Sequence, residues 1–82
     1  MPHVILTGSQ GREFTGGAAE FDVGADTVRR LILELDARYP GFGDYIDRRM
    51  AIAIDGEIHQ DAYGAALRPD SEVCLIPKIG GG

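Results

Sequence analysis

The 82-residue sequence is poor in cysteine and histidine, and each shortage excludes a class of protein. Cys74 is the single cysteine, so no disulfide can form within the chain. The two histidines, His3 and His59, stand far apart and lack the spacing of a zinc site. The sequence therefore predicts neither a disulfide-stabilised fold nor a metal centre.

Positive charge and long apolar runs are also scarce. Eight Lys and Arg residues face 13 Asp and Glu residues, and the net charge of −5 disfavours binding to nucleic acid, whose phosphates require clustered basic residues. No apolar run approaches the roughly 20 residues of a membrane helix. The start of the chain, MPHVILTGSQ, lacks the basic end and long apolar stretch of a signal peptide. We expect a cytoplasmic protein with no nucleic-acid or membrane partner.

What the sequence does contain is a set of short apolar runs and one amphipathic stretch. The stretch that opens at Asp26 places apolar residues three and four positions apart, which predicts a helix that Pro40 and Gly41 end. Phe42, Tyr45 and Ile46 predict a further short turn of helix that packs under the sheet. Alternating or continuous apolar residues predict five strands, at residues 3–7, 18–23, 50–54, 57–60 and 72–76. Residues 8–17 are rich in glycine and are interpreted as a loop or wide hairpin turn.

This order of elements predicts an α+β roll in which one main helix covers a mixed sheet of four to five strands. The first and last strands are strongly apolar, so we expect them to be central neighbours. The alternating strands and the helical stripe predict a core made of Val4, Leu6, Phe21, Val28, Leu31, Ile32, Leu35, Ile52, Ile54, Leu67, Val73 and Leu75.

Three segments give the chain a more specific resemblance. DTVRRLILELDARYPG resembles the helix of the β-grasp sulfur carriers, IAIDGEI resembles the turn after their third strand, and LRPDSEVCLIPKIGGG resembles their last strand and glycine tail. This family includes the small subunit of molybdopterin synthase, the thiamine sulfur carrier and a carrier used in one route to cysteine. The chain departs from the family pattern at Asp55, Ser71, Lys78 and Gly80. Its TGGAAEFDV stretch is closer to carriers of amino-acid sulfur metabolism.

The resemblance implies a ubiquitin-like β-grasp domain over residues 1–78 and a flexible tail over residues 79–82. It implies that the carboxyl group of Gly82 is adenylated and converted to a thiocarboxylate, with Gly80 and Gly81 threading the partner's channel. The chain would then be a protein co-substrate, or the small subunit of a sulfur-transfer complex, with no catalytic apparatus and no cofactor of its own, since the activating enzyme uses the ATP. The implied partners are a ubiquitin-activating-like adenylating enzyme, a sulfur donor and an acceptor synthase. By the same resemblance, the partner-binding positions are Thr7, Ile58, Ile76, Lys78 and Ile79.

Glycine suits such a tail on physical grounds, because a side chain would clash with the walls of a narrow channel. From Ile76 to Gly82 the extended chain reaches roughly 20 Å, far enough to enter a buried pocket. The tripeptide alone also fits a frayed end or an expression scar. The fold also suits a ubiquitin-like modifier joined to lysines, or an interaction module without sulfur transfer.

The remaining polar residues favour ordinary structural roles. The sequence favours a core or sheet-packing position for Cys74, because no basic neighbour would lower the pKa of its thiol. His3 and His59 have no partner carboxylate at a suggestive spacing and are interpreted as surface residues. Arg48 and Arg49 fit a solvated face, whereas Lys78 lies on the path of the tail and could meet an acidic patch on a partner. A polar hairpin is expected at Asp55 rather than a cation site.

Overall fold

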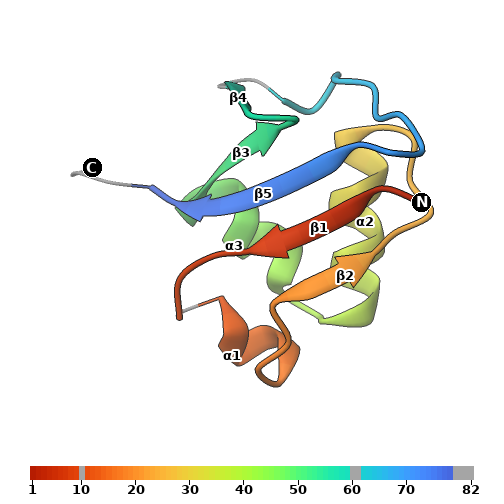
Figure 1. Ribbon diagram of the computed structural model, residues 1–82. Coiled ribbons are helices and arrows are strands. Elements are labelled where there is room, and N and C mark those ends of the chain that lie inside the picture. The colour runs from red at the N-terminus through yellow and green to blue at the C-terminus, as the bar shows by residue number, and fades with distance from the viewer. Residues whose placement is uncertain (10, 60–61, 79–82) are drawn as a thin grey trace.

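The computed structural model describes residues 1–9, 11–59 and 62–78, and Figure 1 shows their arrangement as one sheet backed by helices. The elements follow one another as β1 (His3–Leu6), α1 (Arg12–Thr15), β2 (Glu20–Asp22), α2 (Val28–Arg38), α3 (Phe42–Arg49), β3 (Met50–Ile54), β4 (Glu57–His59) and β5 (Glu72–Pro77).

The five strands form a single mixed sheet in the order β2-β1-β5-β3-β4. β1 and β5 pair in parallel, with Val4 opposite Val73 and Leu6 opposite Leu75, and every other pair is antiparallel. The first and last strands are therefore central neighbours, as the sequence predicted. Because β5 is central, the chain leaves the sheet from its middle rather than from an edge.

Helix α2 is built as the sequence predicted. Thr27 has an extended backbone and its side chain accepts a hydrogen bond from the Arg30 backbone N–H, which satisfies one of the free donors of the first turn. The helix buries Val28, Leu31, Ile32 and Leu35 and ends before Pro40. Together with α3, it covers one face of the sheet and leaves the other face open (Figure 1).

The core lies between this helical layer and the sheet. All 12 residues that the sequence assigned to the core are buried, with Val4, Val28, Leu31, Leu35, Val73 and Leu75 at 0% exposure. Of the three residues that the sequence placed under the sheet, Phe42 and Ile46 are completely buried, and Tyr45 is partly buried against the core. Further buried apolar residues of this core are Val23, Ala25, Met50 and Ala62, whereas Ala53 is buried on the other face of the sheet.

Two segments contain more helix than the sequence predicted. The expected loop over residues 8–17 includes the single helical turn α1, and the expected short turn after Gly41 is the eight-residue helix α3. Phe14 of α1 stacks on Phe42 of α3, with 5.4 Å between the ring centroids. Tertiary contact of this kind stabilises turns that local propensity alone would not, which explains the difference.

The predicted hairpin turn between β3 and β4 is confirmed. Asp55 and Gly56 both have positive φ, at 49° and 88°, as a type I′ turn requires. Asp55 also accepts a hydrogen bond from the Glu72 backbone N–H, and this bond is the main reason that the pKa of its carboxyl group lies below the usual value. The carboxylate therefore connects the turn to β5 by a hydrogen bond, as expected for a polar hairpin.

Candidate functional site: the open face and the base of the tail

The open face of the sheet carries a band of small and apolar side chains. Alternation along β5 sends Val73 and Leu75 into the core and Cys74 and Ile76 to the open side. The strand register aligns Ile5 of β1, Cys74 of β5, Ala53 of β3 and Ile58 of β4 in one row across the sheet. Ile58 is 68% exposed, an unusual amount for a large apolar side chain on a sheet.

A second row lies one step closer to the chain end. Ala51 is the register partner of Ile76, and Thr7 follows β1 on the other side of β5, where its backbone N–H donates to the Leu75 carbonyl at 3.0 Å. The Thr7 hydroxyl donates to the same carbonyl at 3.0 Å, so its polar group is already satisfied by the protein. We define the open-face patch as the two rows together: Ile5, Thr7, Ala51, Ala53, Ile58, Cys74 and Ile76.

The structure thus brings together three of the positions given by the family resemblance. Thr7, Ile58 and Ile76 all belong to the open-face patch. Ile5 completes the patch and was not singled out from the sequence, although the alternation in HVILT places it opposite the core residues of its strand. Lys78 follows directly at the end of β5. Ile79, Gly80, Gly81 and Gly82 lie outside the described residues.

The base of the tail is held by β3 and α3. The backbone N–H of Lys78 donates to the Arg49 carbonyl at 2.9 Å, which extends the β5–β3 pairing by one residue. The Lys78 ammonium group lies 3.4 Å from the Asp47 carbonyl, to which it donates. Arg48 is exposed and pairs with Asp44 one turn earlier, which agrees with the solvated face expected for it. The direction of the last described residues is therefore fixed by backbone pairing.

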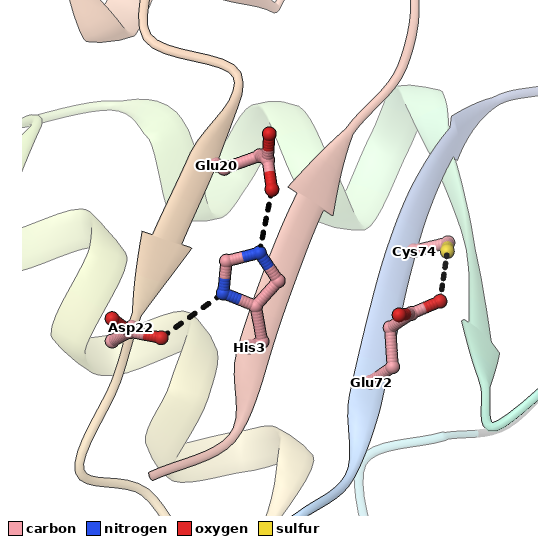
Figure 2. Close-up of polar contacts among 5 residues, drawn as sticks. All are labelled: His3, Glu20, Asp22, Glu72 and Cys74. Atoms are coloured by element: carbon pink, nitrogen blue, oxygen red, sulfur yellow. Dashed lines mark hydrogen bonds and ion pairs between the residues drawn. The ribbon is translucent and has the colours of Figure 1, made fainter.

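An acidic cluster with one histidine lies at the other end of the open face (Figure 2). His3 sits between two carboxylates of β2, with Nδ1 3.0 Å from Asp22 Oδ1 and Nε2 2.7 Å from Glu20 Oε1. Carboxylates accept hydrogen bonds, so both nitrogens donate only when the ring is an imidazolium. The hydrogen bond to Asp22 is the main reason that the pKa of His3 is raised above its ordinary value, and the hydrogen bond to Glu20 adds to the effect.

This cluster corrects the sequence-based expectation that His3 has no partner carboxylate. The β1–β2 register places Asp22 directly opposite His3, and Glu20 lies two residues further along β2 on the same face. The spacing in sequence hides this proximity because the hairpin brings the strands together. His3 is nevertheless a surface residue, as expected, with 39% of its side chain exposed.

Cys74 lies in β5 but does not belong to the core cluster. Of the two roles expected from the sequence, it therefore has the sheet-packing role and not the core role. Its thiol is half-buried on the open face, and Sγ lies 3.9 Å from Glu72 Oε1 (Figure 2). Burial, and then the charge of Glu72, raise the pKa of the thiol. A raised pKa keeps the group as the unreactive thiol at neutral pH. We therefore interpret Cys74 as a packing residue of the open face rather than as a nucleophile.

The described residues contain no group of three or more His, Cys, Asp or Glu side chains that could hold a metal ion. In the same part of the chain, no helix has the length and apolar character needed to cross a membrane. The candidate site thus consists of the open-face patch, the acidic cluster around His3 and Lys78 at the base of the tail.

Comparison with known proteins agrees with this arrangement. The ThiS family model matches residues 8–82. The comparison with curated protein sequences finds no match. Among solved structures, Mycobacterium tuberculosis CysO superposes with a TM-score of 0.84 at 20% identity, covering 96% of this chain and all of that chain. A chain of the Amycolatopsis orientalis BexX/CysO complex superposes with a TM-score of 0.85 at 18% identity over the whole of both chains.

A third similar structure is the small archaeal modifier protein 1 of Methanosarcina acetivorans. It superposes with a TM-score of 0.77 at 23% identity and covers 99% of this chain and 95% of that one. These likenesses confirm the β-grasp, ubiquitin-like fold that the sequence resemblance implied. With a family model that spans nearly the whole sequence, the chain belongs to the ThiS family of β-grasp sulfur carriers.

Proposed function

We propose that this protein carries sulfur on its own C-terminus. The Gly82 carboxylate attacks the α-phosphate of ATP in an adenylating enzyme, pyrophosphate leaves, and an acyl-adenylate forms. A sulfur donor then delivers sulfide sulfur to the activated carbonyl, AMP leaves, and the chain ends in a thiocarboxylate. An acceptor synthase takes the sulfur and returns the carboxylate. In this scheme the chain is a protein co-substrate, and the ATP belongs to the activating enzyme.

The observation that supports this proposal most strongly is the position of β5, the strand from which the tail continues. The family match runs through residue 82, and β5 is central and contributes Cys74 and Ile76 to the open-face patch. A partner that docks on the patch would therefore meet the base of the tail at Lys78. Because backbone pairing holds the chain as far as Lys78, the reach beyond the sheet is counted over the four residue steps from Lys78 to Gly82, roughly 13–14 Å when extended. That length would allow Gly82 to enter an active site beyond the docking surface.

Pyrophosphate exchange with the purified adenylating enzyme of the same organism tests the first step. The wild-type chain is expected to support exchange. Deletion of Gly82 should abolish it, because the new carboxyl end falls about 3.3–3.6 Å short of the α-phosphate and a misplacement of about 1 Å already costs on the order of a hundredfold in rate. Gly81→Val should also fail, by steric exclusion. Full exchange by both variants would refute the proposal.

Mass spectrometry of the chain isolated from its own cells tests the second step. Replacement of oxygen by sulfur gives almost the same mass increase as methionine oxidation, so mass alone is ambiguous. A Cys74→Ser variant removes the one thiol of the chain, after which a thiol-specific alkylating reagent should modify only a terminal thiocarboxylate. A Cys74→Ser chain that still supports pyrophosphate exchange, but takes up no reagent when it is isolated from growing cells, would contradict sulfur loading.

The likeness to a small archaeal modifier protein supports a second candidate function, in which the tail forms amide bonds to lysines. Adenylation is common to both functions, so pyrophosphate exchange does not separate them. Conjugates of higher mass that contain this chain, linked through Gly82, would establish the modifier. If no such conjugates form and the isolated chain carries a reactive thiocarboxylate, sulfur transfer is the function. Identification of the synthase that consumes the loaded chain would establish the acceptor pathway. That pathway could lead to molybdopterin, thiamine, cysteine or another product.

A further inference from the structure

A cavity of about 390 Å³ lies beside the base of the tail, lined by residues of α2, α3, β3 and β4 together with Ala62, Tyr63 and Lys78. Helix α3 runs directly into β3, so the end of the helix and the start of the strand form two of its walls. β4 pairs with Ile52, Ala53 and Ile54 of β3, and its residues Ile58 and His59 add to the lining.

The cavity has an apolar interior and a polar rim. Its walls are formed by the buried side chains of Ile32, Ile46, Met50, Ile52 and Ala62. Asp47, His59, Tyr63 and Lys78 stand at the rim. Ala51 and Ile58 complete the lining and also belong to the open-face patch. The apolar surface of the open face therefore continues around the sheet edge into the cavity.

On the rim of the cavity, Asp47 has a side-chain partner, whereas Lys78 contacts only a backbone carbonyl. The Tyr63 hydroxyl donates to Asp47 Oδ1, which is the main reason that the pKa of Tyr63 is raised to about 12, so this side chain stays neutral. The Lys78 ammonium group contacts only the Asp47 backbone carbonyl, at 3.4 Å. Among the described residues, no carboxylate lies within ion-pair distance of Lys78. The rim thus presents a positive charge that an acidic group from outside could pair with.

We propose that this cavity is the socket for an apolar anchor side chain of the enzyme that takes up the tail, with an acidic residue of the same enzyme beside it to pair with Lys78. The inference rests on the proposed function. An aliphatic or aromatic side chain suits the apolar interior, and protein interfaces commonly gain most of their affinity from a few such anchors in desolvated pockets.

Two features of the chain favour this occupant over a free small molecule. Lys78 is both a wall of the cavity and the last described residue before the tail, so an enzyme that encloses Gly82 passes over the cavity mouth. The interior is continuous with the open-face patch through Ile58, which is 68% exposed, so one partner surface would cover both.

Two substitutions test the socket from different directions. Ala62→Leu adds bulk to a buried wall and narrows the cavity, and Lys78→Glu reverses the charge on the rim. Ala37→Leu is the matched control, because it makes the same chemical change on an exposed position of α2 away from the cavity lining. Far-UV circular dichroism and thermal unfolding of each variant establish that the fold is retained before binding is measured.

The binding measurements use the purified adenylating enzyme of the same organism, by calorimetry and by the KM for the chain in pyrophosphate exchange. Ala62→Leu and Lys78→Glu should each weaken binding by at least about tenfold, the effect of losing one anchor contact. The control should bind as the wild type does. Wild-type affinity in both test variants would overturn the socket while leaving the proposed function intact.

Methyl NMR of the wild-type chain gives an independent readout. Met50 is 3% exposed and lines the cavity, so its methyl signal should shift when the enzyme is added only if a side chain enters. A titration that shifts Ile76 on the open face but leaves Met50 unchanged would refute the socket. A chain that no adenylating enzyme activates would instead overturn the proposed function, and the inference with it.

Discussion

The burial of Leu31 makes the helix–sheet packing testable by a pair of substitutions on one helix. Leu31 and Leu33 both lie within α2, two residues apart, but Leu31 is 0% exposed and Leu33 is 62% exposed. Replacing either by alanine makes the same change in helix propensity and removes the same atoms. The difference between the two variants therefore isolates the contribution of burial.

For Leu31→Ala we expect a loss of about 2–5 kcal/mol in the free energy of unfolding, which combines lost transfer energy with the cavity left behind. For Leu33→Ala we expect a change within about 0.5 kcal/mol, as for most exposed positions. A domain of this size has a total stability of roughly 4–12 kcal/mol. Leu31→Ala should thus remove a large part of it and lower the midpoint of thermal unfolding by roughly 10–30 °C.

Urea unfolding followed by far-UV circular dichroism is the suitable assay, because the chain has no tryptophan to report on packing by fluorescence. The unfolding slope against urea should be similar in both variants, so that a shifted midpoint reports stability. If Leu31→Ala cost less than about 0.5 kcal/mol, or no more than Leu33→Ala, the helix could not pack with the face described above.

Three further predictions concern the surface and the base of the tail. Asp22→Asn should lower the pKa of His3, measured by NMR of its ring protons; because that pKa is raised, the stabilising ion pair is complete below pH 6.5 and is lost as the pH rises through the raised value. Ile76→Asp should weaken docking of the adenylating enzyme without unfolding the chain, because Ile76 lies on the open face, and unchanged calorimetric affinity would place the docking surface elsewhere. Gly8→Ala should lower the unfolding midpoint in urea, because Gly8 has a φ of 82° and a Cβ there would lie 2.7 Å from Pro77 Cγ; an unchanged midpoint would contradict that contact.

Most of the fold could be predicted from periodicity, because burial of one face imposes a regular pattern on the sequence. The stripe from Val28 to Leu35 and the alternation around Phe21 both report which side of an element meets the core. Helix α1 could not be predicted in this way. It has four residues between glycines, and Phe14 packs on Phe42 and Tyr45, which are distant in the sequence.

The candidate site was predicted less completely for a related reason. Thr7, Ile58 and Ile76 came from family resemblance, and the structure places them on one face. The pairing of His3 with Asp22 depends on the register of a hairpin, and no local pattern encodes that register. The cavity depends on how α2, α3, β3 and β4 come together, which is again a property of tertiary packing rather than of any one element.

The parallel pairing of β1 and β5 gives the open face a direction. His3 lies opposite Glu72 at the start of the two strands, Ile5 lies opposite Cys74 in the middle, and Lys78 follows the end of β5. The face therefore changes from an acidic flank around His3 to apolar residues and then to Lys78. Interface charges set orientation and association rate more than affinity. A partner whose own charges complement this gradient would meet like charges if it docked in reverse, so the parallel pairing that gives the face its direction would also favour one docking orientation.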